Sequence, residues 1–519
     1  MLSPYTGPWE YAQAAHLLRR CIYGPRRARI LQAVADGMEA TVDALLTLPP
    51  PADPPVYFDF EDDPLAKIGE SWVDKPITKN ISGIYFHRDK SLWAWWFMRM
   101  SREQHSILEK MTLFWHNHFV VAEAGTPNMN WAYLSLIREF ALGNFRELSK
   151  RMTIDQSMLI YLNGTQNVKD EPNENYAREL LELFTIGKGP LVAEGDYTHY
   201  TEQDVAAIAR ALTGWVAWNG DKLQARFSNS RHDTGSKQLS HRFNNQVIEN
   251  AGEQEYARVI DLIFEQEEVS RHICRRLYIW FVHYDITPEV EQQVIAPMAR
   301  ILRQHDYHLK PVMEALLKSQ HFYDHSLQGA MIKNTFDFFF SVYNSLEVAP
   351  PADLLKEYDM WSRWYWEMNK LEMAFFKIPS VAGWRAYYQE PIFYRDWVNS
   401  ASLTLRKKLL QKINGLIDYV DKGHLGLDLL RFVGSLQDPL DVNNMIDEIC
   451  LLLFPRPMSQ EQKDFFKESL IPGLPNFEWT AEYGAYLNDP GNTEKRRAVE
   501  NKLWQMFNAM FGAPEFQLC

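Results

Sequence analysis

The sequence of 519 residues has no apolar run of the ~18–20 residues that a membrane-spanning helix needs. Its most apolar stretch, residues 92–100, is short and is flanked by charged side chains. No apolar segment follows the positive charges near the N-terminus, so no secretory signal is visible. We therefore expect a soluble protein without a membrane span, cytoplasmic by default, with export alongside a bound partner as the alternative.

Cysteine is scarce, and positive charge is outnumbered by negative charge. The four cysteines, at positions 21, 274, 450 and 519, include no pair at the short spacings of zinc or thioredoxin-like motifs. They predict buried, inert thiols or a reducing compartment. The 54 lysines and arginines face 67 acidic residues, which gives a net charge of −13. Because such a protein repels phosphate backbones, nucleic acid is not an expected partner.

Several widespread catalytic motifs are also missing. The sequence contains no P-loop, no G-x-S-x-G elbow, no G-x-G-x-x-G after a strand, no H-E-x-x-H and no C-x-x-C-H haem signature. The common cofactor enzymes and the enzymes built on these motifs are therefore disfavoured.

What the sequence does contain is helical patterning. Good helix formers alternate with proline, glycine and asparagine breaks, and no alternating run is long enough for a large sheet. We predict a mainly α, large multi-helical globular fold with long irregular loops and at most a small β-hairpin, in the loop at 218–243. Proline-rich breaks at 49–55 and 349–353 divide the chain. The predicted regions are an N-terminal helical hairpin at 1–48, a helical core at 56–348, and an aromatic-rich and helical C-terminal region packed on the core at 354–519.

A run of basic residues lies in the C-terminal region. Arg406, Lys407, Lys408 and Lys412 alternate with apolar residues at helical spacing. This spacing is typical of the solvated face of an amphipathic helix, and we interpret the run in that way.

The first polar motif is F-W-H-N-H-F, with His116 and His118 two positions apart. An H-x-H pair shares a face only on extended backbone, and a helix turns the two rings about 200° apart. A helical projection places His105, Glu109, Thr112 and His116 on one polar stripe. His116 with Glu109 is therefore the candidate metal ligand or acid–base pair. His118 falls on the apolar face, where we expect a core histidine bonded to a carbonyl, with metal ligation as the alternative.

The second motif, P-N-E-N-Y-A-R-E-L-L-E-L-F-T-I-G, is a helix delimited by proline and glycine. Glu179 and Glu182 lie three positions apart on its polar side with Asn175, and Arg178 lies beside them. Two carboxylates at this spacing are ligands that a helix offers to a divalent metal. The alternative is a solvated face with ion pairs from Arg178 to Glu174 and Glu182.

Two further motifs follow. In Y-T-E-Q-D-V-A-A-I-A-R-A-L-T-G-W a capping box begins at Thr201, and Arg210 is expected to pair with a glutamate of the previous helix. In the loop motif R-H-D-T-G-S-K, His232, Asp233 and Lys237 are candidates for acid–base catalysis or metal ligation.

These motifs, together with A-A-H-L-L-R-R-C-I-Y-G-P near the N-terminus, P-S-V-A-G-W-R-A-Y-Y-Q-E-P and the terminal A-P-E-F-Q, resemble one family over nearly the whole chain. It is the bacterial domain-of-unknown-function family numbered eighteen hundred. The resemblance implies no established activity. It implies a companion protein of the family numbered fifteen hundred and one, which is similar to the sulfatase and alkaline phosphatase superfamily. Many members carry export signals, whereas this sequence shows none, so co-export with a partner is the hypothesis that reconciles the two.

Two functional hypotheses follow for the segment 109–237. In the first, His116, Glu109, Glu179 and Glu182 form an enzyme-like site for a divalent metal, covered by the loop at 232–237, with hydrolase-like and oxidoreductase-like chemistry both open. A His-Asp phosphohydrolase is a remote variant of it. In the second, the polar motifs are buried networks of a non-enzymatic binding or assembly partner of the companion protein. The aromatic segments at 361–366 and 384–394 then form a surface for a partner or a glycan.

Overall fold

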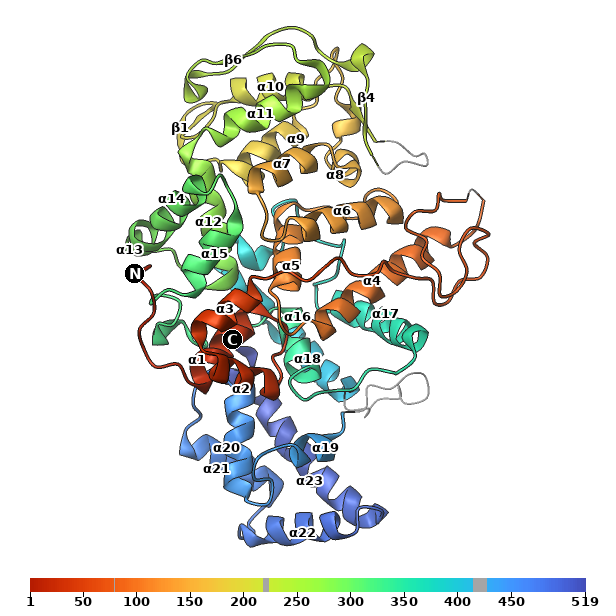
Figure 1. The fold of residues 1–519 in the computed structure, drawn as a ribbon, viewed down its shortest axis with the longest axis vertical. Helices are drawn as coiled ribbons and strands as arrows, with labels where there is room; N and C mark the ends of the chain where they lie inside the picture. Colours follow the sequence, from red (N-terminus) through yellow and green to blue (C-terminus); the bar gives the residue numbers. More distant parts are fainter. Residues whose placement is uncertain (79, 218–223, 414–426) are drawn as a thin grey trace.

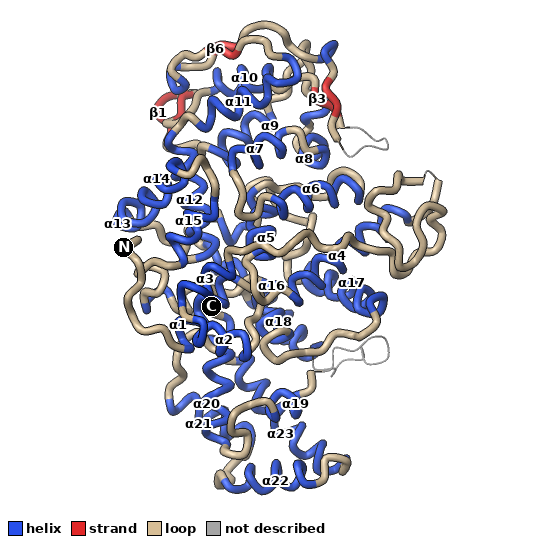
Figure 2. The backbone as a smooth tube through the Cα atoms, in the orientation of Figure 1, coloured by secondary structure: helices blue, strands red, loops and turns tan. Residues whose placement is uncertain are grey.

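The protein is mainly α-helical, as predicted (Figures 1 and 2). Its structure, a computed structural model, describes residues 1–78, 80–217, 224–413 and 427–519. Strands in these ranges form only three two-stranded antiparallel sheets, so the predicted single hairpin is replaced by three small ones. Over the same ranges, no helix combines the length and the apolar character that crossing a membrane requires.

The molecule is elongated, and its helices lie in three tiers (Figure 1). The upper tier contains α7 (Phe145–Thr153), α8 (Gln156–Tyr161), α9 (Asn175–Glu179), α10 (Glu202–Ala211) and α11 (Glu255–Phe264). Its strands are β1 (Leu191–Ala193), β2 (Asp196–Tyr197), β3 (Trp215–Val216), β4 (Arg226–Phe227), β5 (Lys237–Gln238) and β6 (Val247–Ile248). The sheets pair β1 with β2, β3 with β4 and β5 with β6. The start of the predicted loop, at 218–223, lies outside the described residues.

The middle tier carries the largest part of the core. Its helices are α4 (Ile84–Arg102), α5 (Leu108–His118), α6 (Pro127–Glu139), α12 (Glu267–Phe281), α13 (Pro288–Val290), α14 (Ala296–Gln304), α15 (Leu309–Leu317), α16 (Thr335–Tyr343), α17 (Leu354–Lys370) and α18 (Ser400–Ile413). Below α15 lie α1 (Tyr11–Cys21), α2 (Arg27–Asp36) and α3 (Met38–Leu45), so the first 48 residues hold three helices.

The lower tier is formed by the end of the chain. It contains α19 (Leu429–Gly434), α20 (Val442–Leu453), α21 (Gln460–Leu470), α22 (Phe477–Asn488) and α23 (Thr493–Gly512). The last residues then return upward, where Ile332 and Leu518 form a backbone bridge and the buried Phe516 packs on Phe338. The four cysteines are buried free thiols, as the sequence predicted.

The aromatic segments predicted as a partner surface belong instead to the core. Helix α17 packs along α4, with the Trp93 ring stacked 3.8 Å from Tyr365 and Trp361 fully buried. Trp384 is also buried, and Trp366 is the exposed tryptophan of this group, at 38%. The prediction was wrong for most of these rings because large aromatic side chains on two long helices are stabilised most by burying each other.

Helix α5 is shorter than the projection assumed. It begins at Leu108, and His105 lies exposed in the turn before it. The Glu103 carboxylate accepts the backbone N–H groups of both His105 and Ser106, at 2.9 Å each, and so stabilises the turn between α4 and α5. The predicted stripe therefore loses its first member.

Helix α9 changes its winding after one turn. It continues as a π-helical turn over Leu180–Thr185 and ends at Gly187, whose φ of +74° favours glycine. A Cβ at this position would lie 2.9 Å from Nδ1 of His272. Glycine thus ends the helix where the sequence predicted and also permits a close approach of α12.

Arg406 does not lie on a solvated face. Helix α18 buries Leu409 and Leu410 as predicted, but Arg406 is 1% exposed and donates to the carbonyl oxygen of Lys333 at 2.7 Å. The last residues of the chain cover it through a 2.8 Å hydrogen bond to Oε1 of Gln517. A helical pattern could not predict this cover, which comes from residues more than one hundred positions away.

Candidate functional site

The residues predicted as one site lie in three polar networks, each on a different set of elements. We name them the α5 network (Glu109, His116, Tyr133, Arg138), the α9 network (Glu174, Arg178, Glu179, Glu182, Tyr200, Glu202) and the Glu255 network (Arg210, Thr213, His232, Asp233, Lys237, Glu255). Hydrogen bonds and ion pairs join residues within each set, such as Glu109 with Arg138, Arg178 with Glu202, and His232 with Glu255.

Glu109 in the α5 network is a buried ion-pair partner. Its two carboxylate oxygens each lie 2.7 Å from one guanidinium nitrogen of Arg138, and the indole of Trp96 donates at 3.1 Å. The side chain is 2% exposed. Glu109 therefore joins α5 to α6 and α4, and every donor around it is already committed.

His116 has both ring nitrogens engaged. The backbone N–H of Phe376 donates to Nε2 at 3.1 Å, so Nε2 carries no proton and Nδ1 donates to the Tyr133 hydroxyl at 3.0 Å. That hydroxyl donates onward to the Phe119 carbonyl at 2.7 Å. Burial lowers the pKa of His116 to about 3. The imidazole is thus a neutral, fixed link between α5, α6 and the segment after α17.

His118 is the core histidine that the helical projection predicted. Nε2 lies 3.0 Å from the Phe184 carbonyl, and the ring is buried. Burial, with the nearby charges of Arg276 and His272, lowers its pKa well below the ordinary value. His118 therefore connects α5 to the π-helical turn.

The α9 network is an ion-pair lattice between helices. Arg178 donates to both carboxylate oxygens of Glu202 on α10 at 2.7 Å and to Glu174 at 3.1 Å. The predicted Arg178–Glu182 pair is replaced by this contact, because Glu182 instead accepts from Tyr200 and Lys188. An ion pair between these two helices was predicted for Arg210 of α10 with a glutamate of α9. The pair that joins them is instead Arg178 of α9 with Glu202 of α10.

Glu179 and Asn175 have separate roles in the same region. Glu179 is half-buried, and burial followed by the charge of Glu182 raises its pKa. Nδ2 of Asn175 donates to the Leu162 carbonyl at 3.3 Å, so it ties α9 to the end of α8. Two neighbouring carboxylates are present here, but the described parts of the chain bring no three His, Cys, Asp or Glu side chains together as metal ligands. The divalent-metal site stays a prediction.

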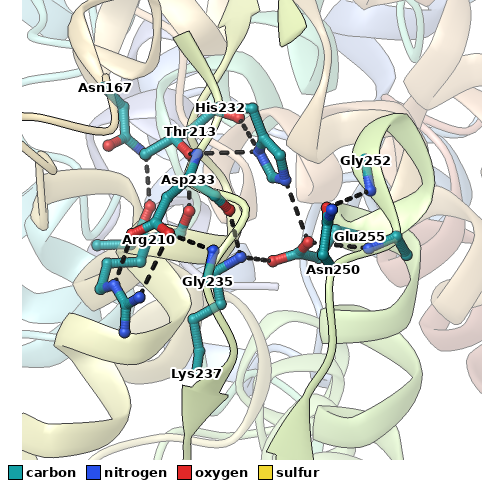
Figure 3. A network of polar contacts seen from close by, with 12 residues as sticks. Asn167, Arg210, Thr213, His232, Asp233, Gly235, Lys237, Asn250, Gly252 and Glu255 are labelled. Carbon is teal, nitrogen blue, oxygen red and sulfur yellow. Dashed lines mark hydrogen bonds and ion pairs between the residues drawn. The ribbon is translucent and has the colours of Figure 1, made fainter. Parts of the chain in front are cut away.

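The loop motif at 232–237 converges on a residue that the sequence did not single out (Figure 3). Nε2 of His232 lies 3.1 Å from one carboxylate oxygen of Glu255, and Nζ of Lys237 contacts the other. Nδ1 of His232 lies 2.9 Å from the Thr213 carbonyl. Both ring nitrogens therefore contact oxygen atoms of other parts of the fold, and these two contacts fix the orientation of the imidazole.

Asp233 turns the other way, toward α10. Its carboxylate accepts from Arg210 at 2.7 and 3.3 Å and from the N–H of Gly235 at 2.8 Å. These contacts hold its pKa below the ordinary value despite partial burial. His232 and Asp233, adjacent in sequence, therefore serve different partners and do not form an acid–base pair.

The centre of the Glu255 network, the pair of Lys237 and Glu255, is closed to solvent. Lys237 and Glu255 are 0% exposed, and the N–H of Ala251 fills a further acceptor position of the carboxylate at 3.1 Å. Its contacts connect β5, the first turn of α11 and the end of α10 (Figure 3). Glu255 lies 18 positions after Lys237, and an acidic residue in a first helical turn ordinarily indicates only a favourable dipole interaction. No local signal could have identified it.

An open groove lies elsewhere, between the N-terminal helices and α20. It encloses about 480 Å³ and is lined by Tyr11, Arg27, Leu31, Gln437, Asp438, Asn444, Asp447, Glu448 and Leu451. Its size falls in the range of ligand-binding clefts. No local sequence pattern predicts this groove, because its walls come from opposite ends of the chain.

The groove combines apolar and acidic groups. Leu31 on α2 and Leu451 on α20 are 41% and 47% exposed. Of the three carboxylates, Glu448 pairs with Arg27, whereas Asp438 and Asp447 have no cationic partner among the lining residues, and Asp438 accepts from the Asn444 amide at 2.9 Å. Asp447 is paired with Lys463 outside the groove at 2.8 Å and stays half-exposed.

Comparison with known proteins places the chain in one family. A family model described as a protein of unknown function (DUF1800) matches residues 16–518. No curated protein and no solved structure matches the chain. This is the family that the sequence motifs resemble. Its description names no activity, so it assigns no catalytic residue to this chain.

Proposed function

Because the chain belongs to the DUF1800 family, whose function is unknown, we propose from its geometry that it is a binding protein that holds a basic, leucine-containing segment of a partner polypeptide in the groove between α2 and α20. The observation that carries this proposal is the groove itself, with exposed leucines on two walls and carboxylates between them.

The apolar half of the groove supplies affinity. Leu31 and Leu451 are large apolar side chains left in contact with water on the walls of a concave site. Covering such side chains stabilises a complex by roughly 25 cal/mol per Å² of apolar surface. A leucine or isoleucine of the partner inserted between α2 and α20 meets both side chains.

The acidic half of the groove selects a partner segment with positive charge. Asp438 and Asp447 face the groove without an internal cation, in a chain of net charge −13. Complementary charges at a rim favour the right partner and speed its arrival. A lysine or arginine next to the apolar anchor is therefore the expected neighbour.

Of the two functional hypotheses for the segment 109–237, a groove of this kind favours the non-enzymatic binding or assembly role. It is supported by the α5 and Glu255 networks, in which His116, Glu109 and Lys237 are bonded to other parts of the fold and are buried. The companion protein similar to the sulfatase and alkaline phosphatase superfamily is the first partner to test, and export together with it is the corresponding proposal for location.

The test is a binding titration with a defined probe. A fluorescein-labelled peptide that alternates leucine and arginine is titrated with the full chain, and fluorescence anisotropy gives Kd. We expect Asp438→Lys with Asp447→Lys to weaken binding at least about tenfold, and Leu451→Ser about fivefold. A peptide with glutamate in place of arginine is expected not to bind.

Asp464→Lys on α21 is the matched control, since Asp464 is exposed but lies outside the groove. The control is expected to keep the wild-type Kd. The proposal fails if the wild-type chain does not prefer the arginine peptide, or if the groove variants bind as well as the control. If the peptide results support the groove, co-purification of the companion protein with wild type but not with the groove variants would identify the partner.

The metal hypothesis has its own test. Elemental analysis of the purified chain, of His116→Ala and of Glu179→Ala shows whether a divalent ion is bound at either position. A stoichiometric metal lost from both variants would favour the enzyme-like alternative over the binding role.

A further inference from the structure

Five cationic side chains meet where the N-terminal helices, α16, α18 and the end of the chain come together. They are Arg19 and Arg20 of α1, Lys110 of α5, Lys333 before α16, and Arg406 of α18. Four of them are almost fully buried, between 1% and 4% exposed, and Arg19 is partly buried.

Only one of the five has a carboxylate partner among the contacts of the described residues. Lys110 is paired with Asp337. The others donate to neutral acceptors. Arg19 donates to the carbonyl oxygens of Leu451 and Leu452, and Arg20 donates to the Leu327 carbonyl and the Met331 sulfur. Lys333 donates to the Phe516 carbonyl and the Ser341 hydroxyl, and Arg406 donates to the Lys333 carbonyl and the Gln517 side-chain oxygen.

The charges at this junction do not balance. Five positive groups face one acidic side chain, that of Asp337. Burial lowers the pKa of Lys333 to about 7, so part of the population relieves one charge, and an excess of positive charge still remains. An isolated charge in a protein interior is strongly destabilising unless a counter-charge accompanies it.

Two small cavities adjoin these cations. Each encloses about 20 Å³, and both are lined by Arg19, Asp337 and Cys519. The first also touches Arg20 and Lys110, and the second touches Lys333. This volume accommodates one particle of about the size of water and excludes an oxyanion such as sulfate or phosphate.

Unused donors accompany the cavities. Nε of Arg20 and Nε of Arg406 are buried and have no hydrogen-bond acceptor in the described structure. Buried guanidinium N–H groups without acceptors are rare because each one costs the free energy of desolvation. Arg20 lines the first cavity directly.

We infer that the cavity lined by Arg19, Arg20 and Lys110 is a structural site for a monovalent halide, with chloride as the physiological ion. A halide supplies the missing negative charge, accepts N–H donors from several directions and is only slightly larger than water. The site joins α1, α5 and the end of the chain. It shares no lining residue with the groove, although Arg19 donates to the carbonyl oxygen of Leu451 on the groove wall, and the inference does not rest on the proposed binding function.

The first test is the dependence of thermal unfolding on the anion. An ion that binds only the folded chain raises the unfolding midpoint with the logarithm of its concentration. Between about 5 and about 500 mM, we expect sodium chloride to raise the midpoint by roughly 2–5 °C more than sodium gluconate, whose anion is too large for the cavity.

Variants assign the effect to the site. Arg20→Met and Lys110→Met are each expected to remove at least half of the chloride-specific shift. Arg496→Met, which removes an exposed cation of α23, is expected to keep it in full. An equal shift in all three variants would overturn the inference.

A direct readout does not depend on the stability of any variant. Wild-type crystals soaked in sodium bromide are expected to show anomalous scattering of bromine in the cavity beside Arg20. Anomalous density at surface positions only, together with equal unfolding midpoints in chloride and gluconate, would show that water fills the cavity and that no halide site exists.

Discussion

At the scale of single residues, the polar groups that most resemble catalytic side chains are those most completely paired. Lys237 and Glu255 are fully buried and bonded to each other, and His116 is held between a hydroxyl and a backbone N–H. A pair of this kind is strongly destabilising when it is broken, because the remaining charge stays buried without a counter-charge. These residues are therefore expected to report on stability.

The first prediction concerns the Lys237–Glu255 pair. In Lys237→Met, Glu255 keeps only His232 and a backbone N–H as partners, so we expect the free energy of unfolding to fall by about 3 kcal/mol. Urea unfolding followed by tryptophan fluorescence measures it. The exposed pair of Arg496 and Glu500 is the control, and Arg496→Met is expected to cost less than about 1 kcal/mol. Equal losses in the two variants would contradict a buried pair.

The second prediction concerns the titration of His116. Its folded pKa of about 3 lies below the ordinary 6.5, so the unfolded chain binds the proton first as the pH falls. The stabilisation is fully present above pH 6.5 and is lost as the pH falls toward 3, at up to about 1.4 kcal/mol per pH unit. In His116→Gln the slope of unfolding free energy between about pH 6 and pH 4 should decrease by this amount.

The difference between wild type and variant is the quantity to compare in that experiment. His16 and His272, whose pKa values burial also lowers to about 3, add slopes of the same sign. Asp155, whose pKa burial raises to about 7, adds a slope of the opposite sign. An unchanged slope in His116→Gln would mean that the histidine titrates normally and is accessible to protons, as a catalytic base would be.

At the scale of secondary-structure elements, Asp204 shows how one helix start organises a loop. It completes the capping box of α10 by accepting the Thr201 N–H at 2.8 Å. The same carboxylate accepts the N–H and hydroxyl of Ser240 at 2.7 and 2.6 Å. The start of α10 and the loop between β5 and β6 are therefore joined through one buried side chain.

The third prediction follows from this joint. Asp204→Ala removes the acceptor of four buried donors, the N–H and hydroxyl groups of Thr201 and Ser240, so we expect a loss of about 2–3 kcal/mol and faster amide hydrogen exchange in residues 237–248. Exchange measured by mass spectrometry locates the effect. Glu202→Ala, on the same turn but partly exposed and paired with Arg178, is the matched control and should leave the exchange of this loop unchanged. If Asp204→Ala speeds amide exchange only in α10, Asp204 does not connect the start of α10 to the loop between β5 and β6.

At the scale of the whole molecule, the last residues connect the lower tier to the middle tier. Phe516 is fully buried against Phe338 and Phe511, and its carbonyl accepts from Lys333. The segment therefore acts as a strap across α16, α18 and α23, which places the cationic junction under the end of the chain.

The fourth prediction tests the strap. Phe516→Ala leaves a cavity the size of a phenyl ring and is expected to cost about 3–5 kcal/mol. Removal of residues 514–519 also takes away one acceptor each of Lys333 and Arg406, and calorimetry should then show the lower tier melting separately and earlier. Leu487→Ala, at an exposed leucine of α22, is the control and should leave the calorimetric profile unchanged. A single unaltered transition in the truncated chain would contradict the role of the strap.

Much of the fold was predictable from the sequence, because its signals are local. The mainly α class, the capping box at Thr201, the end of the α9 segment at Gly187 and the core position of His118 all follow from neighbours within a few positions. The candidate site was predicted less well. Its residues were assigned to one site and lie in three networks, and their function stays a prediction.

The sequence by itself determined that the fold is mainly helical and where some of its segments are capped, such as α10 at Thr201 and the α9 segment at Gly187, since capping and helical periodicity act over one or two turns. Only the tertiary structure decided the partners. Glu255 joins Lys237, the end of the chain covers Arg406, and Leu31 faces Leu451 across the groove. Ion pairs and grooves join residues that are near in space and distant in sequence, and no local pattern records that distance.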